Sequence, residues 1–138
     1  MDKRITDFIT QNKVFTMATS HENMPYCASC FYAYDDKKQL LIFSSENHTN
    51  HIKQALINNN VSGTINAEVT TIAKIKGIQF KGKFINPSKE EQESFYNIYY
   101  KRFPYARAKP APIWAIALTW IKMTDNTLGF GKKLEWES

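Results

Sequence analysis

The sequence predicts a mainly β domain, a small antiparallel barrel with a few helices packed outside it. Three observations favour this fold: short β-rich segments recur at regular spacing, tight turns join most of them, and only three segments have helical periodicity. A doubly wound parallel fold would need a helix after nearly every strand, and this chain has too few helical segments for that fold. The chain has 138 residues, so we expect a single domain over residues 1–138.

The N-terminal part predicts one helix and three strands. Ile5, Phe8 and Ile9 share one face of a helix over residues 2–12, and Asn12 can end it. Three segments rich in β-formers follow, joined by turns typical of hairpins: Val14–Ser20, Tyr26–Tyr34 and Leu40–Ser45.

The middle of the chain adds a short helix and two strands. The helix has apolar residues at i, i+3 and i+4 and is expected to end in residues that tolerate a left-handed conformation: Ile52, Ala55 and Leu56, then Asn58–Asn60. The two strands are Val61–Asn66 and Ile72–Ile85. Gly77 and Gly82 inside the second strand indicate a bulge or a close backbone approach.

The last third begins with a helix and ends in strands. Ser88 and Glu91 have capping-box spacing, and the helix that they start should stop before Pro104. Its apolar face carries Phe95, Ile98 and Tyr99. Two further β segments follow, the first either one bent strand or two: Ile113–Asp125 and Lys132–Glu137. The expected total is six to eight strands and three helices.

Composition narrows the class of protein. Hydrophobic residues make up 43% of the chain, which excludes disorder as its main state. Lys and Arg number 18 against 13 Asp and Glu, a net charge of +5 that suits either nucleic acid or a small phosphorylated ligand. No apolar run approaches the roughly 20 residues of a membrane helix, and no secretory signal is recognisable, so we expect a cytoplasmic protein.

Cys27 and Cys30 form a C-x-x-C motif, which is typical of a redox pair or half a metal site. Here the motif lies in an extended segment, where residues i and i+3 point to opposite faces. No pair of histidines has the spacing to complete a metal site. We therefore interpret the two cysteines as strand residues and expect no metal.

The segment Ser44–His51 joins a predicted strand to a predicted helix start. Helix N-termini offer unpaired N–H groups and the favourable end of the helix dipole to an anion. Three hydroxyls and two imidazoles lie around this point: Ser44, Ser45 and Thr49, with His48 and His51. The segment is either a phosphate cradle or an ordinary helix start capped by Asn47 or Thr49.

Three further segments carry candidate residues. Gln79 lies on the polar face of an alternating strand, next to Lys81 and Lys83. Residues 96–107 mix aromatic and basic side chains, which suits either base stacking or packing of a helix end against the barrel. Residues 124–133 contain G-x-G followed by Lys132, either a phosphate contact or a solvated lysine. No triad of nucleophile and base is recognisable, so catalysis would depend on a cofactor.

Several segments together resemble the FMN-binding split-barrel family around pyridoxamine 5′-phosphate oxidase, and most closely its short bacterial YhbP-type branch. The similar segments span most of the chain: Phe31-Tyr32, Thr49-x-His51, Ile78–Gly82, Arg102-Phe103-Pro104-x-Ala106-Arg107, Ala111-Pro112-x-Trp114 and Thr124–Lys133. The resemblance implies a six-stranded antiparallel split barrel that forms a homodimer, with two flavin sites at the subunit interface.

The same resemblance implies roles for particular residues. The strand-to-helix junction would bind the FMN phosphate, with His51 standing where relatives often carry Lys or Arg. Ser29 and Phe31 would line the isoalloxazine, Gln79 would touch the flavin, and Trp114 would approach from the partner chain. The substrate-binding arginine and histidine pattern of the true oxidases is not recognisable, so their activity is not carried over.

The leading hypothesis is a homodimer that binds FMN and uses it to oxidise or reduce a small molecule. The predicted cofactor-binding residues are Ser29, Phe31, Ser44, Ser45, Thr49, His51, Gln79, Trp114 and Lys132. Three alternatives stay open: a split barrel that holds haem or another flat cofactor, a barrel whose cofactor site has decayed, and a basic module that binds nucleic acid through residues 96–107. Nucleic acid is the less favoured partner because the excess charge forms no continuous stripe.

Overall fold

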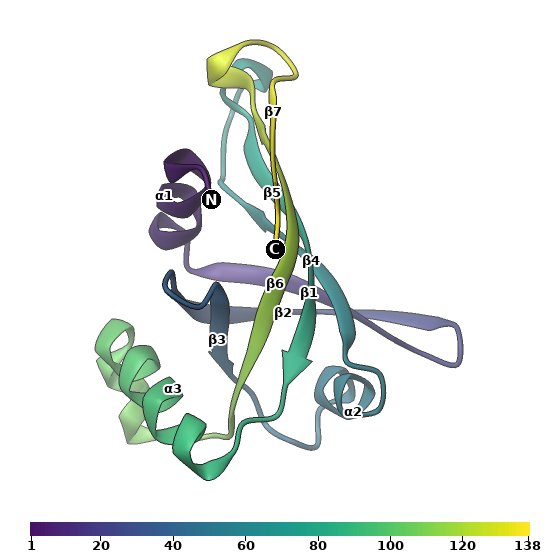
Figure 1. The fold of residues 1–138 in the computed structure, drawn as a ribbon, viewed down its shortest axis with the longest axis vertical. Coiled ribbons are helices and arrows are strands. Elements are labelled where there is room, and N and C mark those ends of the chain that lie inside the picture. The colour runs from purple at the N-terminus through teal and green to yellow at the C-terminus, as the bar shows by residue number, and fades with distance from the viewer.

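The computed structural model describes residues 1–138 and contains three α-helices and seven strands (Figure 1). The first half contains α1 (Lys3–Gln11), β1 (Val14–His21), β2 (Met24–Asp35), β3 (Leu40–Ser44), α2 (Asn50–Ile57) and β4 (Asn60–Asn66). The second half contains β5 (Lys76–Ile85), α3 (Lys89–Arg102), β6 (Ile113–Asp125) and β7 (Lys133–Glu137).

All strand pairings are antiparallel, and the sheet runs in the order β3-β2-β1-β4-β5-β6-β7. A further pairing between β3 and β6 closes the first six strands into a barrel. β7 pairs with the C-terminal half of β6, beyond the part of β6 that contacts β3. The predicted mainly β, antiparallel split barrel with helices outside it is therefore confirmed, although the sheet has seven strands and not six.

Alternation along the strands builds the barrel interior. Twenty buried residues form one core cluster, which includes Phe15 stacked on Tyr32 with ring centroids 5.6 Å apart. On β5, Ile78, Phe80 and Phe84 point inward whereas Gln79 and the lysines point outward, as the alternating pattern predicts.

A second cluster lies outside the barrel, where α3 covers β2, β3 and β6. Phe95 and Tyr99 of α3 pack there against Ile42 and Ile113. The capping box that starts α3 is present: Ser88 Oγ accepts from Glu91 N–H, and Glu91 Oε1 accepts from Ser88 N–H. The predicted bulge is also confirmed, since the β5–β6 register shifts between Lys81 and Gly82.

Two details of the predicted elements are wrong. Residues 72–85 are not one strand, because Ile72–Lys74 form a 3₁₀ turn and β5 begins at Lys76. Asn126 holds that turn by donating to the carbonyls of Ile72 and Ile75 at 2.9 Å. The end of α2 is not left-handed either: Asn58 is extended, with φ −123°, and the chain runs directly into β4.

No helix is both long and apolar enough to cross a membrane.

Candidate functional site

The segment between β3 and α2 forms a compact polar cluster around His51. His51 is the second residue of α2 and only 8% exposed. Its Nε2 lies 2.8 Å from Ser45 Oγ and 3.9 Å from Cys30 Sγ on β2. The imidazole is therefore held in a fixed position by the end of β3 and by the inner face of β2.

The first residues of β6 fix the other side of this cluster. Trp114 Nε1 donates to the Ser45 carbonyl at 2.9 Å, and Ser44 Oγ donates to the Pro112 carbonyl at 3.0 Å. The Ser45 N–H donates to the same Pro112 carbonyl at 3.1 Å. The structure thus brings together Ser44, Ser45, His51 and Trp114 within one chain, with Thr49 next to them in sequence.

The N-terminus of α2 carries no side-chain cap. Thr49 occupies the N-cap position, but its hydroxyl donates to the Glu46 carbonyl at 2.8 Å and accepts from no helix N–H. The N–H groups of Asn50, His51 and Ile52 donate to no backbone carbonyl. Neither Asn47 nor Thr49 therefore caps the helix, and three unpaired donors remain at the positive end of its dipole.

Electrostatics at this helix start comes from backbone donors and not from a fixed cation. Burial lowers the pKa of His51, so its imidazole is neutral at neutral pH. The nearest basic residue along the chain, Lys53, is exposed on α2. This donor set fits phosphate oxygens as hydrogen-bond acceptors, while the charge of a phosphate would be balanced only by the helix dipole.

Ser29 and Gln79 lie elsewhere, on the outer face of the barrel. Ser29 Oγ lies 3.1 Å from Thr16 Oγ1, and Thr16 lines a pocket of about 320 Å³ together with Gln79. Trp120 and Lys81 complete one side of this pocket, with the Lys81 ammonium 5.1 Å from the Trp120 ring centroid. The pattern of the sequence did not single out Thr16 or Trp120, although their outward position follows from strand alternation.

Phe31 and Lys132 are also separate from the His51 cluster. Phe31 is 56% exposed and packs edge-on against Phe103, with ring centroids 5.7 Å apart. Lys132 lies in the loop between β6 and β7, at the opposite end of the long axis from α2 (Figure 1). One chain therefore does not bring all nine predicted residues to one place.

Cys30 is a residue of this cluster that the sequence did not assign to it. Its thiol faces inward, packs on the core and lies beside His51, whereas Cys27 is exposed. Burial raises the pKa of the Cys30 thiol to about 11, so it is protonated at neutral pH. Both cysteines are free, which agrees with the prediction that they face apart.

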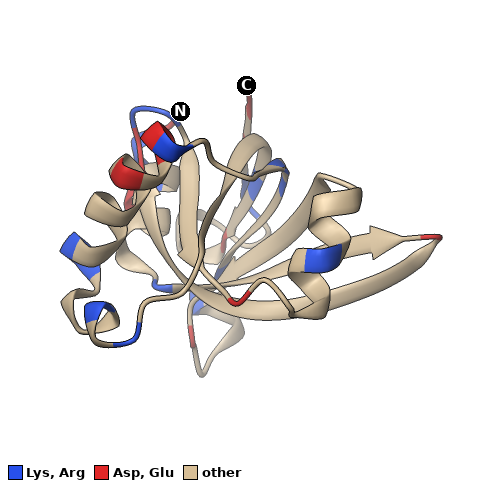
Figure 2. Cartoon of the chain, turned by 90° about the horizontal axis from the view of Figure 1, so that it is seen from below, with Lys and Arg blue, Asp and Glu red and all other residues tan.

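The aromatic and basic residues 96–107 mainly pack. Arg102 Nη2 donates to the Asn12 carbonyl at 2.5 Å, and its guanidinium lies over the Tyr32 ring. Arg107 lies over the Tyr100 ring in the same way. In Figure 2, Lys and Arg are scattered over helices, strands and turns and form no continuous stripe.

Comparison with known proteins places the chain in a family by sequence, although no family model matches it. A UPF0306 protein from Yersinia pestis (strain Angola) is 42% identical over 132 residues, which cover 96% of this chain and 90% of that protein. This chain belongs to the UPF0306 family. A UPF0306 protein from Yersinia pseudotuberculosis (strain IP 31758) has the same identity over the same length.

Three solved structures share the fold of this UPF0306 protein. A haem-binding protein from Mycobacterium smegmatis has a TM-score of 0.78 at 13% identity, covering 94% of this chain and 55% of that one. An FAD-binding protein from Mesorhizobium loti has a TM-score of 0.73 at 17% identity, covering 89% and 93%.

The third is a Clostridium acetobutylicum protein related to general stress protein 26, of the pyridoxinephosphate oxidase family. Its TM-score is 0.70 at 11% identity, and the match covers 98% of this chain and 92% of that one. At these identities the three likenesses show the fold alone.

Proposed function

We propose that this UPF0306 protein binds FMN and that the N-terminus of α2 holds the phosphate. The observation that carries this proposal is the uncapped helix start, with three unpaired N–H groups beside Thr49. An anion at a helix N-terminus completes such donors and is stabilised by the dipole. The FAD-binding and pyridoxinephosphate oxidase relatives of the same fold support a flavin as the ligand.

His51 and Ser45 position this site. The Ser45 hydroxyl and the Cys30 side chain hold the imidazole, and Trp114 holds the Ser45 backbone. Protonation of His51 would add the positive charge that the site lacks at neutral pH, and a bound phosphate would favour that protonation. We therefore propose His51 as the residue that tunes affinity for the phosphate with pH.

We further propose that the flavin site is completed by a second copy of the chain. The support is the exposed outer edge of β2: β3 pairs only with its residues Tyr32–Asp35, so Met24–Phe31 have one free edge. Met24, at the tip of the β1–β2 hairpin that extends from the barrel in Figure 1, is 66% exposed, and Phe31, at the base of that hairpin, is 56% exposed. Exposed strand edges and apolar side chains favour association.

The flavin would supply the electron transfer, and the protein would supply the binding site for it and for a small-molecule substrate. Ser29, Gln79 and Lys132 would then contact the flavin from either chain.

The single-domain organisation, the cytoplasmic location and the YhbP-type branch stay predictions, as does the absence of pyridoxamine phosphate oxidase activity.

A fluorescence titration of FMN with the purified protein tests this proposal. We expect quenching on binding and weaker binding of riboflavin, which lacks the phosphate. We also expect a loss of about tenfold in affinity for Thr49→Ala, because the hydroxyl that now donates to the Glu46 carbonyl would turn to donate to the phosphate. Thr10→Ala is the matched control, because Thr10 also donates to a backbone carbonyl, on α1. Equal affinity for FMN and riboflavin, or no quenching at all, would contradict the proposed phosphate site.

Haem is the second candidate because a neighbour of the same fold is a haem-binding protein. Against it, the Nε2 of His51 already contacts Ser45, so an axial bond from this nitrogen would break that contact. The same protein titrated with haemin distinguishes the two cofactors. A shifted haem absorbance band that His51→Ala removes, without FMN quenching, would replace the flavin proposal.

A further inference from the structure

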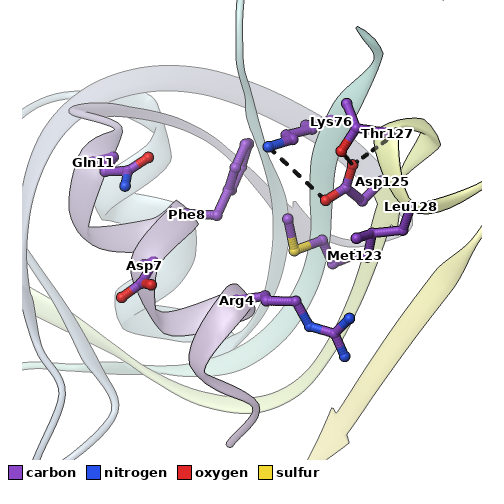
Figure 3. Close-up of a pocket in the computed structure, with 9 residues that line it drawn as sticks. All are labelled: Arg4, Asp7, Phe8, Gln11, Lys76, Met123, Asp125, Thr127 and Leu128. Carbon is purple, nitrogen blue, oxygen red and sulfur yellow. Dashed lines mark hydrogen bonds and ion pairs between the residues drawn. The ribbon is translucent and has the colours of Figure 1, made fainter. Parts of the chain in front are cut away.

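A pocket of about 270 Å³ lies between α1 and the end of the barrel that carries the β6–β7 loop (Figure 3). It is lined by residues from α1, the start of β5, the end of β6 and the turn that follows. None of these residues belongs to the His51 cluster or to the other predicted flavin contacts. Asp125, Thr127 and Leu128 of this pocket belong to the segment 124–133. In the proposed flavin site, Lys132 is the only residue of that segment with a role.

Asp125 at the end of β6 is the most buried polar group in this pocket. Its side chain is only 6% exposed. Oδ1 accepts two hydrogen bonds from Thr127, from the N–H at 3.0 Å and from Oγ1 at 2.5 Å. Oδ2 accepts no hydrogen bond, and Lys76 Nζ lies 3.9 Å from it, beyond the reach of a direct one. Asp125 Oδ2 therefore reaches the pocket with the Lys76 ammonium, 3.9 Å away, as its only charged partner.

The other charged residues around the pocket already have direct partners. Arg4 Nη2 donates to Asp2 Oδ2 at 2.8 Å, and Lys3 Nζ donates to Asp7 Oδ2 at 2.7 Å. Lys76, by contrast, has no acceptor within hydrogen-bond distance and is 40% exposed. One acceptor and one cationic donor thus lie side by side and are both available to a ligand (Figure 3).

Three apolar side chains and Gln11 of α1 complete the lining of this small pocket. Phe8 and Met123 are 6% and 2% exposed, and Leu128 lines the pocket from the loop side. A volume of about 270 Å³ has room for several water-sized groups. A free amino acid with a branched aliphatic side chain is small enough to enter it.

We propose that this pocket binds a small zwitterion, an α-amino acid with an apolar side chain. Its ammonium group donates to Asp125 Oδ2, and its carboxylate accepts from Lys76 Nζ. Its side chain lies against Phe8 and Met123. The ligand ammonium pairs with the Asp125 carboxylate, and the ligand carboxylate pairs with the Lys76 ammonium. A simple anion or a simple cation could pair with only one of these two residues.

Calorimetric titration with L-leucine tests the site, together with two analogues that each lack one charge. We expect L-leucine to bind, and 4-methylpentanoate and 3-methylbutylamine to bind at least about tenfold more weakly. Asp125→Asn keeps an oxygen for Thr127 but loses the carboxylate, and Lys76→Met loses the cation. Each should weaken leucine binding by about tenfold or more.

Lys89→Met is the matched control, because it removes the same charge from the exposed start of α3. It should leave the affinity for leucine unchanged. If Asp125→Asn unfolds, Lys76→Met still decides the outcome, since that side chain is partly exposed. No heat of binding with L-leucine up to about 10 mM, or equal affinity in the wild type and Lys76→Met, would overturn the proposal.

Discussion

Replacing Ser45 with Ala tests the hydrogen bond that holds His51 at the start of α2. The Ser45 hydroxyl lies 2.8 Å from His51 Nε2, and the only other polar neighbour of that nitrogen is the Cys30 sulfur at 3.9 Å. Without the hydroxyl, a buried imidazole nitrogen keeps only this weak partner, which costs about 1–3 kcal/mol. Since Ser45 is half-buried and water can enter, we expect about 1–2 kcal/mol of lost stability.

Ser44→Ala is the matched control because its loss leaves no polar group unpaired. The Ser44 hydroxyl donates to the Pro112 carbonyl, but that carbonyl also accepts from the Ser45 N–H at 3.1 Å. We expect this variant to lose less than about 1 kcal/mol. Urea unfolding followed by tryptophan fluorescence measures the free energy of unfolding of both variants. In a thermal unfolding experiment, a loss of about 1 kcal/mol corresponds to roughly 4 °C in melting temperature. A Ser45→Ala variant no less stable than Ser44→Ala would refute the role of this hydrogen bond.

Three further predictions follow from burial in the fold. Because burial lowers the pKa of His51 below its usual 6.5, the folded state resists protonation; stability measured by urea unfolding should fall as the pH drops below about 6.5, and less so in His51→Phe. Gly63→Ala should cost about 1–3 kcal/mol or more, because a Cβ there would collide with the Thr16 carbonyl and the Phe80 ring; thermal unfolding no different from the wild type would contradict this. A thiol reagent at pH 8 should label the exposed Cys27 quickly and Cys30 only after unfolding, whereas equal rates for both would show that the pair is not divided between two faces.

The elements set by local chemistry could be predicted from the sequence. Ser88 and Glu91 are three residues apart and form their capping box within a single helix turn. The inward and outward faces of β5 follow from strict alternation. Gly82 adjoins the bulge, and a Cβ there would lie 2.6 Å from the Ala117 carbonyl oxygen, so the close backbone approach requires a glycine. These features depend on neighbouring residues or on the bare geometry of a strand.

The features that were missed depend on contacts between distant segments. The turn at Ile72–Lys74 is held by Asn126, which is 54 residues away from Ile72. Cys30 reaches His51 only because the chain turns after β3 and packs α2 against β1 and β2. Likewise, the segment around Lys132 has glycines and lysines typical of an anion site, but nothing local indicates at which end of the barrel they lie. It was therefore easier to select candidate residues from the sequence than to predict which of them lie together in the fold.

The most direct test of the account is whether the protein carries FMN through gel filtration as a dimer. The chain is mixed with excess FMN, and light scattering and flavin absorbance are recorded across the protein peak. We expect a mass near twice that of the 16.0 kDa chain, with flavin present in proportion to the number of chains. A protein peak free of flavin at every FMN concentration tested would contradict it.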